Sequence, residues 1–502
     1  MKIKYLLVAG SLLFLQSCKE YLDVAPKDQQ TQEQLFSSKG GFYMATNGIY
    51  NGLSSNELYG RSLSYELIEV MAKRYVVSPS NLALTDASNY SYSSANLNPR
   101  INAVWQKAYE LIMSCNVLIK NANEQNGLLT ENEKNVLLGE MYATRAFLHL
   151  DMLRLFGPRW DNNPNTLTIP YNDSPVAAVH SLLPYEQVIQ KLESDMNEAE
   201  RLLSADPIIT KGPMASFAEN ESTQLRFRQF RFNYYAVKAL KARFYLHIGN
   251  KEKALIAAKE VINDPKVNQH FPSVDPNKLL ANNTNPDRVF STEVLMGCYV
   301  KDRDNAYSRY FNPESAGINF LQPYEAFVSS RLFVPAFGLL GSFENTDYRY
   351  QTQWEVAPTG AKGHVFKKYK QITQPISTDG SAEYYYSRMI PLIKLSEMYY
   401  IAMECESTVS AQLAWFDAIR SKRGIAQNPT IGIYMSIPTY YEAYFTYVLE
   451  NEIMREFWGE GQIFYFLKRR KVDQAYENGQ ILGYAYYSDA AYQLPLPDGE
   501  IK

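Results

Sequence analysis

Apolar residues recur every three or four positions over several long stretches of the chain, which is the spacing of one buried helix face. The clearest stretch opens at Asn98-Pro99, because Asn can cap a helix start and Pro suits its first turn. We expect Trp105 to belong to the core here and not to a ligand-binding surface. The stripe consists of Ile101, Val104, Trp105, Ala108, Leu111, Ile112, Cys115, Leu118, Ile119 and Ala122.

A second helix is predicted from Thr130, where Glu133 three residues later completes a capping box, to the stop signal at Gly157-Pro158. A third is predicted over residues 185–203. Both add amphipathic length to the same N-terminal region.

Two further stretches, 234–264 and 392–423, each predict a helical hairpin, the first turning at Gly249-Asn250. Small and aromatic residues in the first hairpin have a spacing that resembles a tetratricopeptide repeat. These residues are Ala242, Tyr245, Ala254 and Ala258. The sequence therefore predicts a mainly α fold, a tetratricopeptide-like scaffold of stacked helix pairs.

Between residues 266 and 390 the helical periodicity disappears and Gly, Pro, Asn, Asp and Tyr become dense. We expect a loop-rich insertion with minor β structure. Long loops within a compact protein usually carry function, so this insertion is a candidate binding region.

The N-terminus has the pattern of a lipoprotein signal. Lys2 and Lys4 precede an uncharged apolar run that ends at Leu15, too short to span a membrane. The run closes on Leu15-Gln16-Ser17-Cys18, which resembles a lipobox, although an ordinary signal could also contain a cysteine. We interpret residues 1–17 as a lipoprotein signal peptide, Cys18 as the lipidated residue and 18–34 as a tether.

Composition narrows the function classes. The 502 residues carry 50 basic and 53 acidic side chains, and this balance gives no electrostatic reason to bind nucleic acid. Tyrosine is abundant, with 39 residues, and suits half-wet surfaces that contact polar ligands as well as the rims of helical cores. We expect most of the tyrosines to be structural. Cys115, Cys298 and Cys405 have neither disulfide nor metal spacing, so we interpret them as buried free thiols.

Sequence motifs give no support to an enzyme. The five histidines form no H-E-x-x-H motif, and neither a nucleophile elbow nor a phosphate-binding glycine loop is found. His149 and His247 fall in predicted helices, so we expect them to be packed. Asp302-Arg303-Asp304-Asn305 lacks the glycine and distal glutamate of a calcium loop, so we predict neither metal nor cofactor. A glycosidase would need only two spaced carboxylates, which leaves a secreted hydrolase open as a minor alternative.

Five segments in order resemble the starch-utilisation-system D family (SusD/RagB). These are Lys19-Glu20-Tyr21-Leu22-Asp23 with Pro26, the helix Glu140 to Pro158, the helix Leu395 to Glu404, the motif Glu452, Arg455, Glu456, Glu460 and Gly461, and the tail Leu494 to Ile501. The resemblance divides the chain into a SusD-like N-terminal helical region, 35–265, and a RagB/SusD C-terminal region, 266–502. Ile463 and Phe466 depart from the family pattern, where an arginine and an aspartate are usual.

The resemblance implies a non-catalytic lipoprotein, lipid-anchored in the outer membrane and exposed at the cell surface. It further implies a SusC-like TonB-dependent outer-membrane transporter as partner, to which the protein delivers oligosaccharide. A peptide ligand of the same uptake type, or a structural subunit with no ligand of its own, stays open as an alternative.

Two loop clusters combine aromatic rings with hydrogen-bonding side chains, as a sugar site requires. The first cluster, before the helix at 98, contains Tyr90, Tyr92 and Asn96. The second, in the insertion, contains Tyr299, Asp302, Arg303, Asn305, Tyr307, Arg309 and Tyr310. Trp354 and Tyr384-Tyr385-Tyr386 are further candidates. For any single tyrosine, a structural role is the stronger expectation.

Overall fold

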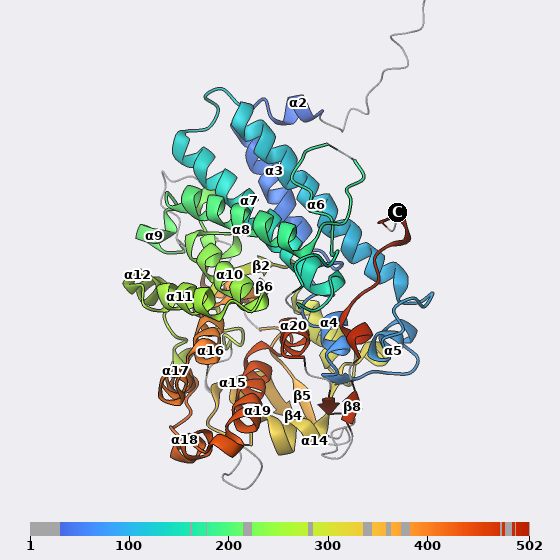
Figure 1. The fold of residues 1–502 in the computed structure, drawn as a ribbon, viewed down its shortest axis with the longest axis vertical. Helices are drawn as coiled ribbons and strands as arrows, with labels where there is room; N and C mark the ends of the chain where they lie inside the picture. The colour runs from blue at the N-terminus through green and yellow to red at the C-terminus, as the bar shows by residue number, and fades with distance from the viewer. Residues whose placement is uncertain are drawn as a thin grey trace, which may run out of the picture.

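The computed structural model describes residues 31–160, 163–176, 178–213, 223–279, 285–334, 344–357, 363–372, 382–471, 474–476, 484–486 and 488–500. Its main body is a row of α-helices, each packed against the next along most of the chain (Figure 1). They are α3 (Lys39–Leu53), α6 (Asn98–Glu124), α7 (Glu131–Phe156), α8 (Tyr185–Leu203), α10 (Tyr234–His247), α11 (Lys251–Ile262), α16 (Leu395–Cys405), α17 (Val409–Ser421), α18 (Pro429–Met435) and α19 (Pro438–Phe457). The predicted tetratricopeptide-like, mainly α fold is confirmed.

Local capping explains where several of these helices begin. The cap expected from Asn98 is wrong, because the N-cap of α6 is Leu97 and no side chain caps this helix, although Pro99 lies in the first turn as expected. The Thr130 side chain accepts a hydrogen bond from the Glu133 amide, and the Glu133 carboxylate accepts one from Thr130, the predicted capping box. Asn233 and Asn250 cap α10 and α11 in the same manner. Gly249 turns the chain between α10 and α11 with φ +73°, a left-handed conformation that favours glycine.

The described residues also form four two-stranded antiparallel sheets and several short helices. The strand pairs are β1 (Tyr75–Val76) with β3 (Gln322–Pro323), β2 (Val294–Tyr299) with β6 (Met389–Lys394), β4 (Trp354–Val356) with β5 (His364–Phe366), and β7 (Gln474–Tyr476) with β8 (Tyr484–Tyr486). The short helices are α2 (Gln32–Leu35), α4 (Leu67–Met71), α5 (Leu82–Ser88), α9 (Ile208–Lys211), α12 (Pro265–His270), α13 (Asp304–Ala306), α14 (Glu325–Phe327), α15 (Tyr348–Gln353) and α20 (Ile463–Arg469).

The hairpin expected over 392–423 needs one correction. Leu392 lies in strand β6, and the helix begins at Leu395. All six residues of β6 are buried, so the segment shows no alternation of apolar and polar positions that would mark it as a strand. In the insertion, the described residues form no α-helix longer than six residues, in keeping with the predicted loop-rich character.

Helix α7 is buried all round and carries charged residues into the core. Arg154 pairs with Asp151 three residues earlier, and the Tyr59 hydroxyl donates to the Asp151 carboxylate at 2.7 Å. Arg145 binds Asp195 of α8 at 2.6 Å. Because a buried charge is tolerated only when it is paired, these contacts fix the register of α7 against its neighbours.

A larger ion network lies under the C-terminal motif. Arg423 contacts Glu293 at 2.7 Å and Glu456 at 2.8 Å, and Lys394 contacts Glu456 at 2.9 Å. The network also contains Arg349, Arg420, Arg455, Lys368, Glu344, Asp347, Glu452 and Glu460. These cations hold the pKa of Glu452 at about 2, since their attraction outweighs the large opposing effect of its burial.

Gly461 ends the same motif in a conformation that needs glycine. Its φ is +74°, its amide donates to buried Glu69 at 2.9 Å, and a Cβ at this position would collide with the carbonyl oxygen of Leu63. The motif from Glu452 to Gly461, whose spacing resembles the family, therefore contributes to packing in the C-terminal half.

Candidate functional site

A polar cleft of about 520 Å³ opens between the end of α3 and the segment that follows β2. A hollow of this size is within the usual range for ligand-binding pockets. Its lining residues are Asn51, Ser54, Ser55, Asn56, Gly60, Tyr65, Val300, Lys301, Asp302, Asn305, Ala306, Arg309 and Tyr310. We call this hollow the 302 cleft. It joins two parts of the chain that lie about 250 residues apart.

The insertion forms one wall of the 302 cleft, and buried arginine holds that wall in place. Arg303 is 3% exposed, and its Nη1 donates to the carbonyl oxygen of Met389 at 3.2 Å. Arg388 donates to the Lys301 carbonyl and pairs with Asp304 at 3.0 Å. With these residues anchored inward, the turn presents Lys301, Asp302 and Asn305 outward, and all three are exposed.

The wall continues into a π-helical turn, Tyr307–Phe311. Tyr310 and Phe311 are buried on its inner side, whereas Arg309 is exposed on its outer side. π-Helical turns are rare and are frequent at functional sites, because the extra residue re-aims side chains. Here the turn leaves the guanidinium of Arg309 at the cleft.

The opposite wall is the C-terminal end of α3 and the turn that follows it. Ser54 is the C-cap of α3, and Gly60 is buried where the turn folds back onto it. A Cβ on Gly60 would collide with the carbonyl oxygen of Ser54, so only glycine allows this tight approach. Asn51 and Asn56 are exposed on this wall.

Hydrogen-bonding groups dominate the chemistry of the 302 cleft. Its two lining rings, Tyr65 and Tyr310, are each only 5% exposed, and the Tyr310 hydroxyl accepts a hydrogen bond from Arg61 at 3.3 Å. Burial raises the pKa of Tyr65, so it stays a neutral phenol. The arrangement can bind hydroxyls, carboxylates or other polar groups through amides and charges, but it offers little ring face for stacking.

The structure places Asp302 and Asn305, both predicted, in the 302 cleft together with Arg309 and Tyr310. Two other predicted residues lie outside its lining. Tyr299 is 48% exposed at the end of β2, where its ring meets Phe230 edge-on, and half-buried Tyr307 donates to Glu355 at 2.7 Å.

Three predicted residues are buried, which removes them from any surface that a ligand could contact. Tyr92 is 6% exposed, and its hydroxyl donates to the Ala491 carbonyl at 2.5 Å. Arg303 anchors the turn described above. Trp354 is 2% exposed and packs against Trp458. Each of these side chains serves packing, and none is carried into the proposals below.

The first loop cluster does not line the 302 cleft. Tyr90 is half-buried with φ +58°, its hydroxyl donates to the Met71 carbonyl at 3.1 Å, and Lys73 lies over its ring. Asn96 is exposed, and its amide donates to Asp86 at 3.1 Å. Tyr385 and Tyr386 pack against the core, whereas the side chain of Tyr384 lies outside the described residues.

Sequence reasoning missed the α3 wall, namely Asn51, Ser54, Ser55 and Asn56, and also Lys301. A run of small polar residues directly after an amphipathic helix was the available signal. The packing that brings this run to the insertion is long-range and is not encoded locally. Cys18 and most of the tether likewise lie outside the described residues.

The two histidines that were expected to be packed, His149 and His247, are buried. His149 is buried between Tyr171, stacked at 3.8 Å, and the Asn172 amide, and its burial lowers its pKa to about 3. Burial also lowers the pKa of His247. Both histidines pack in helices as predicted. Among the described residues, no group of three or more His, Cys, Asp or Glu side chains is placed to hold a metal ion.

None of the described helices is both long enough and apolar enough to cross a bilayer. Three free thiols lie in the described body: Cys115 and Cys298 are buried, and Cys405 is half-buried. Burial raises the pKa of all three to about 12, so they are poor nucleophiles.

Comparison with known proteins finds similarity to one family. Residues 20–246 match the SusD-like family described as "Starch-binding associating with outer membrane". SusD-like protein P25 of Formosa agariphila is 20% identical over 478 residues, 84% of this chain and 82% of that protein. SusD-like protein P2 of the same organism is 22% identical, over 71% of this chain and 65% of that protein.

Solved structures share the fold over nearly the whole chain. A SusD superfamily protein from Bacteroides thetaiotaomicron has a TM-score of 0.64 at 21% identity, covering 92% of this chain and 97% of that one. Surface glycan-binding protein A from the same organism, solved in complex with laminarihexaose, has a TM-score of 0.57 at 16% identity, covering 93% and 97%. The chain therefore shares its fold with these structures. The match over residues 20–246 agrees with the family resemblance that the sequence motifs indicated.

Proposed function

We propose that this protein is a non-catalytic, cell-surface lipoprotein that captures oligosaccharide in the 302 cleft and delivers it to a SusC-like TonB-dependent outer-membrane transporter. The observation that carries the proposal is a 520 Å³ polar cleft set in a SusD-type fold. Glycan binding is further supported by a relative of the same fold that was solved with laminarihexaose. The transporter partner rests on the family resemblance alone.

The mechanism follows from the chemistry of the two walls. Sugar hydroxyls both donate and accept hydrogen bonds, and an amide side chain can accept through its oxygen and donate through its nitrogen at the same time. Asn51 and Asn56 from the α3 side face Asn305 and Asp302 from the insertion side. A chain of sugars lying between the walls would be held by several individually modest contacts, which suits capture followed by release to a transporter.

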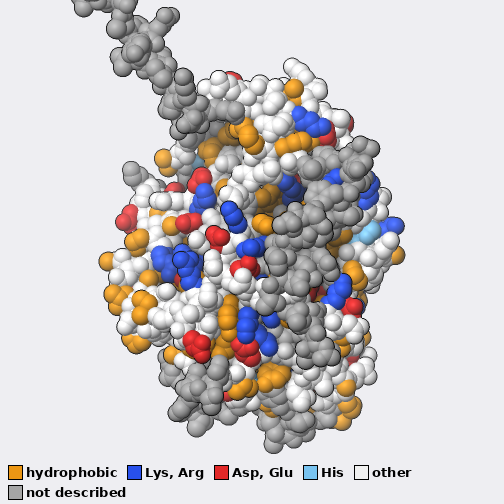
Figure 2. Space-filling view, turned by 180° about the vertical axis from the view of Figure 1, so that it is seen from behind, with side chains coloured by type: hydrophobic (Ala, Val, Ile, Leu, Met, Phe, Trp, Pro, Cys, Tyr) orange, Lys and Arg blue, Asp and Glu red, His pale blue; other side chains and the backbone are white. Residues whose placement is uncertain are grey.

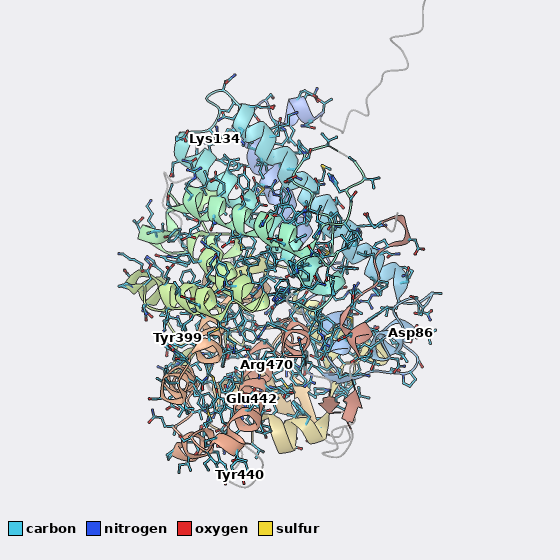
Figure 3. All side chains as sticks on the ribbon, viewed as in Figure 1. Asp86, Lys134, Tyr399, Tyr440, Glu442 and Arg470 are labelled. Carbon is cyan, nitrogen blue, oxygen red and sulfur yellow. The ribbon has the colours of Figure 1, made fainter. Side chains whose placement is uncertain are left out.

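A double variant tests capture. We expect Asn56→Ala with Asn305→Ala to weaken oligosaccharide binding about tenfold, because two hydrogen bonds at about 0.5–1.5 kcal/mol each are lost. Isothermal titration against a panel that includes laminarihexaose would measure this. Tyr440→Ala is the matched control, because Tyr440 is 54% exposed on α19 and lines no part of the cleft. Figure 3 shows Tyr440 at one end of the molecule and Lys134 near the other end.

Three outcomes would contradict the proposal. Equal binding by the double variant and the wild type would place the ligand elsewhere, and a bound peptide with no bound glycan would favour the peptide alternative. Release of new reducing ends from any polysaccharide would indicate a hydrolase.

A further inference from the structure

The charges at the 302 cleft are unbalanced, and the imbalance is positive. Lys301 and Arg309 line the insertion wall as exposed cations, and Asp302 is the one carboxylate among the described lining residues. No carboxylate of a described residue lies within ion-pair distance of Lys301 or Arg309. Two cations are therefore left to solvent or to a ligand.

The other arginines near the cleft are paired or buried, in contrast to Lys301 and Arg309. Arg61, behind the cleft, lies 3.7 Å from Glu66 and also donates to Tyr310. Arg388 pairs with Asp304 at 3.0 Å, and Arg303 is buried against Met389. The fold thus neutralises or buries the arginines behind the wall but leaves Lys301 and Arg309 unpaired at its surface.

The cleft also has little surface suited to a neutral sugar face. Exposed aromatic rings normally cover the apolar faces of sugar rings, yet Tyr65 and Tyr310 are each 95% covered by protein. Recognition here must therefore come from hydrogen bonds and charge. Charge-assisted hydrogen bonds are about twice as strong as neutral ones, and a guanidinium can bind a carboxylate or sulfate in a bidentate manner.

We infer that the ligand of the 302 cleft is an acidic oligosaccharide, whose carboxylate or sulfate-ester groups are bound by Lys301 and Arg309. The inference rests on the proposed function and specifies its substrate class. Asp302 lies next to Lys301 in sequence and accepts hydrogen bonds from ligand hydroxyls, which also disfavours an anionic group at that one point. Figure 2 shows charged side chains of both signs gathered over the middle of the face opposite to that of Figure 1.

Matched pairs of probes that differ only in charge test the inference. Titration calorimetry with the full mature protein would compare oligogalacturonate with its fully methyl-esterified form, and a sulfated galactan oligosaccharide with its desulfated form. We expect the charged member of at least one pair to bind at least tenfold more tightly. The pair that responds identifies carboxylate or sulfate as the recognised group.

Variants then assign the effect to named residues. Lys301→Gln with Arg309→Gln should reduce binding of the charged probe about tenfold and leave binding of its neutral partner within about twofold. Asp302→Asn should leave or strengthen binding of the charged probe. Raising the salt concentration should weaken binding of the charged probe by the wild type and should have little effect on the double variant, because these contacts are exposed to solvent.

The outcomes separate the inference from the proposed function. Tight binding of the neutral members, unaffected by Lys301→Gln with Arg309→Gln, would overturn the acidic-ligand inference while capture of glycan stands. Failure of every glycan probe to bind would overturn both. Binding of an acidic probe that survives the double substitution would also overturn the inference, because the anion would then be held elsewhere.

Discussion

Glu69 shows how burial sets the properties of a single side chain. It lies on α4 at 1% exposure, its Oε1 accepts a hydrogen bond from the Gly461 amide, and the positive charge of Arg74 also favours the ionised carboxylate. Burial raises the pKa of its carboxyl from 4.5 to about 8, because desolvation outweighs the hydrogen bond. At neutral pH the folded protein therefore holds this group protonated.

The raised pKa of Glu69 predicts that this residue lowers the free energy of unfolding as the pH rises. Between about pH 4.5 and pH 8 the folded state keeps a proton that the unfolded state gives up, so Glu69 lowers stability progressively as the pH rises. We expect Glu69→Gln, which keeps the shape without the charge, to match the wild type near pH 5. At pH 9 it should be more stable, by on the order of a few kcal/mol. Denaturant unfolding at the two pH values measures the difference.

A control separates this effect from a general change in charge. Glu110→Gln removes a carboxylate whose side chain is 62% exposed and pairs with Lys107 on the same helix. Its stability difference from the wild type should be nearly the same at both pH values. A Glu69→Gln variant that gains nothing at high pH would mean that Glu69 is already ionised in the fold.

At the residue scale, composition was the only available guide to the candidate site, and ligand contact by the predicted residues stays a prediction. Asp302 and Asn305 could be found because polar residues crowd a loop-rich insertion, and both line the 302 cleft. Tyr92 could not be assigned to the core, because its partner Ala491 lies 399 positions away in the chain. Trp354 is covered by Trp458 in the same way.

At the scale of elements, periodicity and caps predicted the long helices closely. Helices α7 and α8 begin and end within about a residue of the expected positions, and α6 begins at Asn98 as expected. The capping box and the Gly157-Pro158 stop of α7 are local signals. Strand β6 was missed because all six of its residues are buried, which leaves no alternation of apolar and polar positions to detect. The short strands of the insertion were likewise too brief to predict individually.

The ion network predicts how strongly these elements depend on one another. Arg423, at the end of α17, ties together Glu293 before β2 and Glu456 on α19. Arg423→Met would leave buried Glu293 without its cation and would remove one of the cations that contact Glu456, so we expect a loss of about 3–5 kcal/mol in the free energy of unfolding. Chemical denaturation of the purified protein would measure it.

Arg201→Met is the matched control for this experiment. Arg201 pairs with Glu198 on one helix turn, but its side chain is 66% exposed, so its replacement should cost less than about 1 kcal/mol. Similar losses for the two variants would argue that the buried network contributes no more than a surface pair. A large loss for Arg423→Met alone would establish that charge burial couples α17, α19 and the start of β2.

At the scale of the whole molecule, the fold builds the candidate binding cleft by joining distant segments. The α3 wall of the 302 cleft comes from the N-terminal region, and the other wall comes from the insertion, so neither region forms the site alone. Capture at a membrane surface would then require only that the chain be tethered by its N-terminus, ahead of α2.

Tethering is the last prediction and concerns Cys18, which lies outside the described residues. A lipobox cysteine receives acyl chains, and two or more chains together hold a protein stably at a membrane. We expect cells fed radiolabelled palmitate to label the wild type and to leave Cys18→Ser unlabelled, with the variant lost from the outer-membrane fraction. Cys405→Ser, which alters a half-buried thiol in the folded body, should be labelled and retained normally. Retention of Cys18→Ser in the outer membrane would mean that another contact, such as the proposed transporter, holds the protein there.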